Sequence, residues 1–119
     1  MAYLVVLVLD NVEKCEAVLD AWQAAGAGGA TMLESSGLYR HAQALRDDMG
    51  LLPSLQTLLS RHEYRHRTLF TVVEDEATVD AILDATEQIV GDFSKPHTGI
   101  LFVLPVLKAR GLKKVWPKE

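Results

Sequence analysis

Short apolar runs alternate along the chain with longer stretches in which apolar residues recur at helical spacing. The runs are rich in Val, Leu and Ile and end at charged residues, Gly or Pro, which is typical of strands that cross a protein core. Four segments are predicted as strands on this pattern: residues 3–9, 30–35, 67–73 and 100–107.

Two of the intervening stretches are predicted as helices. In the first, Asp10 and Glu13 have the spacing of a capping box, and Gly26 supplies a stop. In the second, Asp75 can act as the N-cap and Gly91 ends the pattern. The residues expected to face inward are Val12, Cys15, Val18, Leu19, Trp22 and Ala25 in the first helix, and Val79, Ile82, Leu83, Thr86, Ile89 and Val90 in the second.

The interval 37–66 contains a helical pattern of its own. Five leucines recur on one helical face, and Pro53 is compatible with a first turn. We therefore predict a packed helix over about 53–61 rather than an irregular loop. The five leucines are Leu51, Leu52, Leu55, Leu58 and Leu59.

The order of the elements, strand–helix–strand–insert–strand–helix–strand, predicts a single α+β domain over 1–119 with a ferredoxin-like βαββαβ fold. A four-stranded antiparallel sheet would carry two helices on one face, with the extra helix in the insert between the second and third strands. Pro105 cannot donate a ladder hydrogen bond, so the last strand is expected at an edge of the sheet.

Strands 3–9 and 100–107 are apolar at both odd and even positions. A sheet with one solvated face should alternate, so both faces of these strands require burial, yet two helices cover only one. We infer a symmetric oligomer that buries the second face. The alternative is that the 37–66 insert folds beneath the sheet.

Composition narrows the class of protein. The chain has 119 residues, 49% of them hydrophobic, and a net charge of −4, which argues against nucleic acid as a partner. The tail 108–119 carries +4 and the remainder −8, so the tail either binds an anion or keeps the end of the chain in solvent. Cys15 is the only cysteine, which favours a reducing cytoplasm and a packing role. The apolar run 3–9 is too short to span a membrane.

Chemistry-bearing residues gather in "RHEYRHR", residues 61–67. His62 and His66 are four residues apart, as a two-histidine metal site on a helix needs, and Glu63 or His41 could complete it. The same basic stretch could hold an acidic partner or phosphate, or form a solvated face. No arrangement of nucleophile and base emerges, so we do not expect an enzyme.

The glycine-rich segment "GAGGATMLESSGLYR", residues 26–40, resembles the corresponding segment of the P-II nitrogen regulatory proteins. The residues that match in spacing are Gly29, Thr31, Glu34, Gly37 and Arg40. The third strand, the second helix and "GILFVLPV" are also similar to that family, so that the resemblance covers about two thirds of the chain. It implies a homotrimer with the sheets inward, ligands in the clefts between subunits, and a regulated partner protein.

The chain departs from the family at the phosphate grip. Ile100 stands where the family has a lysine, Lys95 is displaced, and Lys108 and Arg110 are out of register with the family's arginines. The family's signalling loop is replaced by the leucine-rich insert.

The resemblance implies a ligand site at Thr31, Gly37, Leu38, Lys95, Thr98, Gly99, Lys108 and Arg110. Backbone N–H groups and basic side chains there suit an anion, either ATP or ADP bound weakly or another anionic metabolite. The alternative is a structural turn around an empty cleft. As a function, we expect a non-catalytic P-II-like regulatory trimer in the cytoplasm. The alternative is a trimer of similar fold that binds divalent metal, like the CutA-type proteins.

Overall fold

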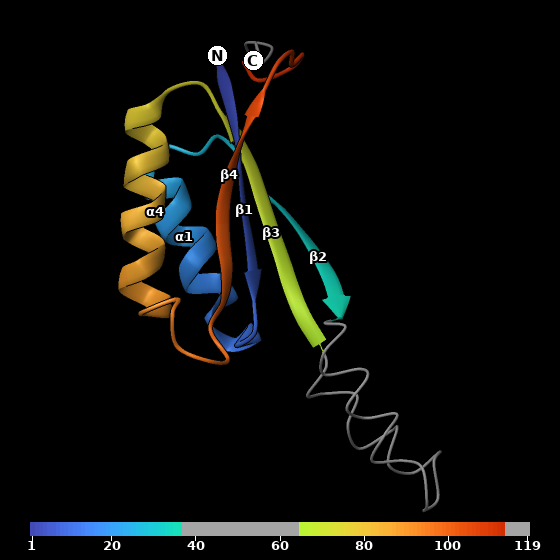
Figure 1. Ribbon diagram of the computed structural model, residues 1–119. Coiled ribbons are helices and arrows are strands. Elements are labelled where there is room, and N and C mark those ends of the chain that lie inside the picture. The colour runs from blue at the N-terminus through green and yellow to red at the C-terminus, as the bar shows by residue number, and fades with distance from the viewer. Residues whose placement is uncertain (37–64, 114–119) are drawn as a thin grey trace, which may run out of the picture.

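The computed structural model describes residues 1–36 and 65–113, which form a four-stranded sheet with two helices (Figure 1). The elements are β1 (Ala2–Leu9), a 3-10 turn η1 (Val12–Lys14), α1 (Cys15–Ala25), β2 (Thr31–Ser36), β3 (Arg65–Val73), α4 (Glu76–Val90) and β4 (Gly99–Val106). The predicted α+β fold is confirmed. The helix predicted over 53–61 lies outside the described residues.

The sheet is antiparallel throughout, with strand order β2-β3-β1-β4. Val6 at its centre lies opposite Phe70 on one side and Phe102 on the other. Both helices lie on the same face of the sheet (Figure 1). β4 is an edge strand, as Pro105 required, and Pro105 is paired with Tyr3.

The core lies between the sheet and the helices. Because side chains alternate across a strand, Val5, Leu7 and Leu9 of β1 point to the helix side, where they are fully buried. Buried residues of the other elements that complete the core include Val18, Trp22, Leu69, Val73, Val79 and Ile82. Cys15 is also buried, and this burial raises the pKa of its thiol, so its predicted packing role is confirmed.

One buried hydrogen bond joins the two helices. The Trp22 indole N–H donates to Thr86 Oγ1 at 2.8 Å, and the Thr86 hydroxyl donates to the Ile82 carbonyl at 2.6 Å. Both side chains are fully buried. The polar atom that Trp22 brings into the core is therefore satisfied, and the contact fixes where α4 lies against α1.

The start of the first helix differs from the sequence prediction. Asn11, and not Asp10, caps it: Asn11 Oδ1 accepts from the Glu13 N–H at 3.1 Å, and a 3-10 turn precedes α1. Asp10 instead lies beside His66 at the start of β3. The predicted cap at Asp75 is confirmed, because its carboxylate accepts from the Thr78 N–H at 2.7 Å, which lowers the pKa of Asp75.

The face of the sheet away from the helices is apolar across β1 and β4. Its exposed members are Ile100 at 55%, Phe102 at 37% and Leu104 at 47%, beside the half-buried Val6 and Val8. In the folded chain, β1 and β4 therefore carry apolar side chains on both faces of the sheet. We call the side chains Leu4, Val6, Val8, Phe70, Val72, Ile100, Phe102 and Leu104 the open face.

No helix among the described residues is long and apolar enough to cross a membrane.

The substitution Thr86→Val should destabilise the fold by about 1–3 kcal/mol, because it leaves the buried indole N–H of Trp22 without an acceptor. Denaturant unfolding at fixed protein concentration measures the change. Gln88→Ala, an exposed position on the same helix, should stay within about 0.5 kcal/mol of the parent protein. Equal stability of the Thr86→Val variant and the parent would show that the hydrogen bond contributes nothing.

Candidate functional site

The basic residues predicted as ligand contacts lie beyond opposite ends of β4. Lys95 precedes the strand, and Lys108 and Arg110 follow it. Gly99 is paired with Leu9 and Val106 with Ala2, so β4 runs the whole length of β1. A strand of this length separates its ends by about 24 Å. The loop before β4, which contains Lys95, therefore lies at one end of the sheet, whereas the segment after β4 lies at the other (Figure 1). Lys108 and Arg110 belong to the segment after β4. One protomer cannot bring these groups around a single small anion.

The loop 91–99 is organised by its own hydrogen bonds. Asp92 Oδ1 accepts from the backbone N–H of Ser94 at 2.9 Å and from its hydroxyl at 2.7 Å, and both bonds lower the pKa of Asp92. The Thr98 hydroxyl donates to the Lys95 carbonyl at 2.8 Å. This bond closes the turn and holds the Thr98 side chain against the loop. Lys95 itself is exposed.

Backbone packing explains why position 99 is glycine, independently of any ligand. Its φ of +111° lies in the left-handed region, and a Cβ built on it would lie 1.9 Å from the Val8 carbonyl oxygen. The close approach that glycine permits here is to β1. Backbone packing therefore explains the glycine at position 99, and its place in the ligand site stays a prediction.

At the other end, the described tail follows β4 beside the start of β1. A cavity of about 370 Å³ is bordered by Ala2, Glu74, Lys108 and Leu112, among others. Lys113 pairs with Glu74 at 3.5 Å, and Arg110 donates to the carbonyl of Ala109 at 3.2 Å. Lys108 and Arg110 are both exposed, so their positive charges are available to an anion from outside the protomer.

Thr31 begins β2 and is paired with Phe70, a member of the open face. The two side chains therefore lie on the same side of the sheet. The Thr31 side chain is exposed. Further along β2, Glu34 pairs with Arg67 of β3. Gly37 and Leu38, which complete the predicted site, lie outside the described residues, as do His41, His62 and Glu63.

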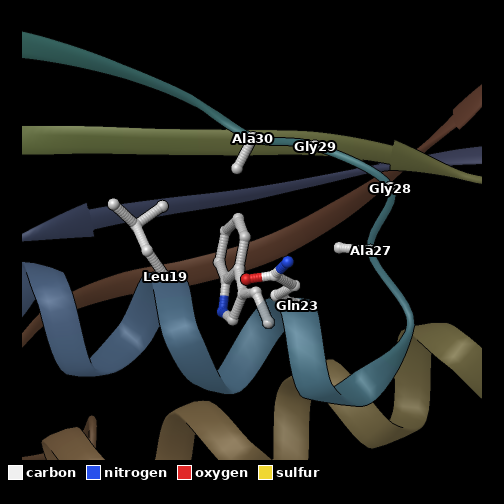
Figure 2. Close-up of a pocket in the computed structure, with 7 residues that line it drawn as sticks. Leu19, Gln23, Ala27, Gly28, Gly29 and Ala30 are labelled. Carbon is white, nitrogen blue, oxygen red and sulfur yellow. The ribbon is translucent and has the colours of Figure 1, made fainter.

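A pocket that the sequence analysis did not predict lies between α1 and the start of β2 (Figure 2). It has a volume of about 210 Å³ and is lined by Leu19, Trp22, Gln23, Ala27, Gly28, Gly29 and Ala30. A Cβ at Gly28 or Gly29 would meet nothing within 4 Å, so no contact within the described chain demands glycine there. The only sequence signal for the pocket was this run of small residues.

His66 is a strand residue in β3. Side chains repeat every two residues in a strand and not every 3.6, so the helical spacing argument for a pair of histidines does not apply at His66. Among residues 1–36 and 65–113, no three His, Cys, Asp or Glu side chains gather as metal ligands would. The one acidic contact of His66 that the structure shows is Asp10, with Nε2 and Oδ1 3.5 Å apart.

Solved structures of P-II proteins resemble this chain over most of its length. GlnK from B. subtilis superposes with a TM-score of 0.58 at 16% identity, covering 89% of this chain and 85% of that one. The chain has the P-II-like fold. The Arabidopsis thaliana PII protein bound to citrate gives 0.58 at 16% identity, covering 88% and 77%. The GlnK–ATP complex gives 0.54 at 14% identity, covering 87% and 79%.

No family model and no curated protein matches the sequence. At 14–16% identity, the structural similarity establishes the P-II-like fold and leaves the ligand to be argued from the residues of this chain.

The variant Gly99→Ala should lose about 2–4 kcal/mol of stability, because alanine is strained at this φ and its Cβ collides with the β1 backbone. Gly28→Ala is the matched control and should change stability by less than about 1 kcal/mol. Thermal and denaturant unfolding of both variants measures this difference. If the two substitutions have the same effect, the packing of Gly99 on Val8 is not the reason for glycine.

Proposed function

We propose that this chain is a non-catalytic regulatory protein that acts as a P-II-like homotrimer and binds an anionic ligand in the clefts between subunits. The observation that carries the proposal is the open face, an apolar sheet surface that no described helix covers, on a chain with the P-II-like fold. The same apolar face from three copies, brought together around a threefold axis, is its most suitable cover.

Trimer formation also resolves the separation of the basic residues. Within one protomer, the loop 91–99 and the tail after β4 are at opposite ends of the sheet. Around a closed ring, the loop of one subunit can approach the tail of the next. Lys95 of one subunit and Lys108 and Arg110 of its neighbour would then surround one anion.

The ligand is proposed to be multiply charged. Structurally similar proteins include a GlnK in complex with ATP and a PII protein bound to citrate, both ligands carrying several negative charges. In this chain the second residue of β4, Ile100, is apolar, and it adds no charge to the proposed cleft. The lysine and arginines expected from the resemblance to the P-II family are replaced or out of register in this chain. Each charge-assisted hydrogen bond contributes roughly 1.5–3 kcal/mol, so the loss of two or three such bonds would make ATP binding weak.

The regulated partner would be another protein in the cytoplasm. A regulator of this kind reports ligand binding through a change of shape rather than through chemistry, and the described residues that line the cleft include amides, hydroxyls and cations suited to binding. Lys95, Thr98, Lys108 and Arg110 therefore have binding roles in this proposal and not catalytic ones.

The substitution Val6→Asp should convert the trimer into monomers or aggregates, because it places a charge at the centre of the open face, between Phe70 and Phe102. Native mass spectrometry and light scattering report the stoichiometry. Ala17→Asp, at an exposed position of α1, should leave the trimer intact. A well-folded monomeric parent protein would refute the assembly.

Calorimetry with ATP and with citrate tests the cleft. The double variant Lys95→Ala/Arg110→Ala should weaken binding of whichever anion binds the parent by about tenfold or more, because two charge-assisted contacts are lost. Lys14→Ala/Lys113→Ala removes the same charge from positions that already contact Ile89 and Glu74, and it should bind as the parent does. Sub-micromolar affinity for ATP, or unchanged affinity in the first variant, would contradict the proposed cleft.

A further inference from the structure

The pocket between α1 and the start of β2 has no part in the proposed anion cleft (Figure 2). Its volume of about 210 Å³ equals that of roughly seven water molecules at about 30 Å³ each, which suits an organic molecule with one ring. The pocket includes residues of α1, which lies on the face of the sheet opposite the open face (Figure 1). Assembly through the open face would therefore leave the pocket accessible.

The apolar side of the pocket is held in place by the protein core. Trp22 is fully buried, Ala27 is buried beside it, and Leu19 packs against the same core. The indole N–H of Trp22 donates to Thr86 Oγ1, so the ring is fixed and does not turn to fill the pocket. A preformed, largely apolar lining of this kind is typical of sites for small organic molecules.

Gln23 supplies the polar group of the pocket. Its side chain is exposed, and its amide has no hydrogen-bond partner within the described part of the chain. A carboxamide offers one acceptor oxygen and two N–H donors. None of the residues that line the pocket carries a charge, so an ion would lose water there without gaining a counter-charge. The lining therefore favours an uncharged ligand that can form hydrogen bonds.

Two glycines leave the wall opposite α1 open. Neither Gly28 nor Gly29 has a positive φ, and a Cβ on either would meet nothing within 4 Å, so the described fold does not require glycine at these positions. The Gly29 carbonyl accepts a hydrogen bond from the Thr71 hydroxyl, which holds this backbone in place. Close approach of a ligand to the backbone is a recognised reason for glycine. A flat ring can lie against the exposed peptide groups.

We propose that this pocket binds a small, uncharged aromatic molecule that carries a hydrogen-bonding substituent. The ring lies between the apolar side chains of Leu19 and Trp22 and the backbone of Gly28 and Gly29, and the substituent bonds to the Gln23 amide. The cations assigned to the anion cleft are absent from this lining. The pocket is therefore a second site, with a different class of ligand.

Benzamide is the probe, and benzoate is its matched control, because the two share a ring and nearly the same size but only benzoate is charged. Full-length ¹⁵N-labelled protein is titrated with each and followed by NMR at the N–H signals of Gly28 and Gly29 and at the Trp22 indole. We expect saturable shifts with benzamide and a dissociation constant below about 10 mM, the weak limit for a ligand of about nine non-hydrogen atoms. At these signals benzoate should bind at least about tenfold more weakly.

Three variants test the lining. Gly28→Val places a side chain in the open space and should weaken benzamide binding by more than about tenfold, with the fold checked by circular dichroism. Gln23→Leu keeps the size of the side chain but removes the hydrogen bond, and it should weaken binding by about two- to tenfold. Gln88→Leu changes an exposed glutamine of α4 and should bind benzamide as the parent does.

Three results would overturn the site: no saturable shift with benzamide, equal affinity for benzoate at the same signals, or unchanged affinity in a folded Gly28→Val variant. Trimer formation and anion binding are measured without benzamide. Failure of this site would therefore leave the proposed regulatory function untouched, and failure of that function would not affect these titrations.

Discussion

Apolar side chains on both faces of β1 are the constraint on which the rest of the structure depends. Val5, Leu7 and Leu9 are fully buried because α1 and α4 cover their face, whereas Val6 and Val8 on the other face stay half-buried. Burial of apolar surface contributes roughly 25 cal/mol per Å², so an uncovered sheet face leaves a large favourable term unused. The single chain therefore leaves an apolar face uncovered, and this uncovered face is the physical reason for proposing that copies of the chain assemble.

The antiparallel sheet also decides where chemistry can occur. Because β4 runs the full length of β1, the loop before it and the tail after it lie at opposite ends of the protomer. An anion that needs cations from both must lie between two protomers. By contrast, His66 and Asp10 meet within one protomer, since β1 ends where β3 begins. The proposed anion cleft therefore requires two protomers.

Local sequence signals are insufficient at positions where a distant segment of the chain decides the contact. Asp10 and Asn11 are adjacent and both suit an N-cap; Asn11 takes the position while Asp10 faces His66 across the sheet. The spacing of His62 and His66 suits a metal site only on a helix, and His66 lies in β3, where it is paired with Ser35 of β2. Gly99 had a ligand interpretation because nothing in the local sequence reveals the Val8 carbonyl against its backbone.

The sequence alone determined the strands, the helices, their order and the edge position of β4, because hydrophobic periodicity and Pro105 act locally. It also determined that β1 and β4 are apolar on both faces of the sheet. The spatial neighbours of each polar group were decided only by the tertiary structure. Strand register set Asp10 against His66, and helix packing set Trp22 against Thr86 across 64 residues of chain. These pairings depend on contacts between distant segments, which no local pattern encodes.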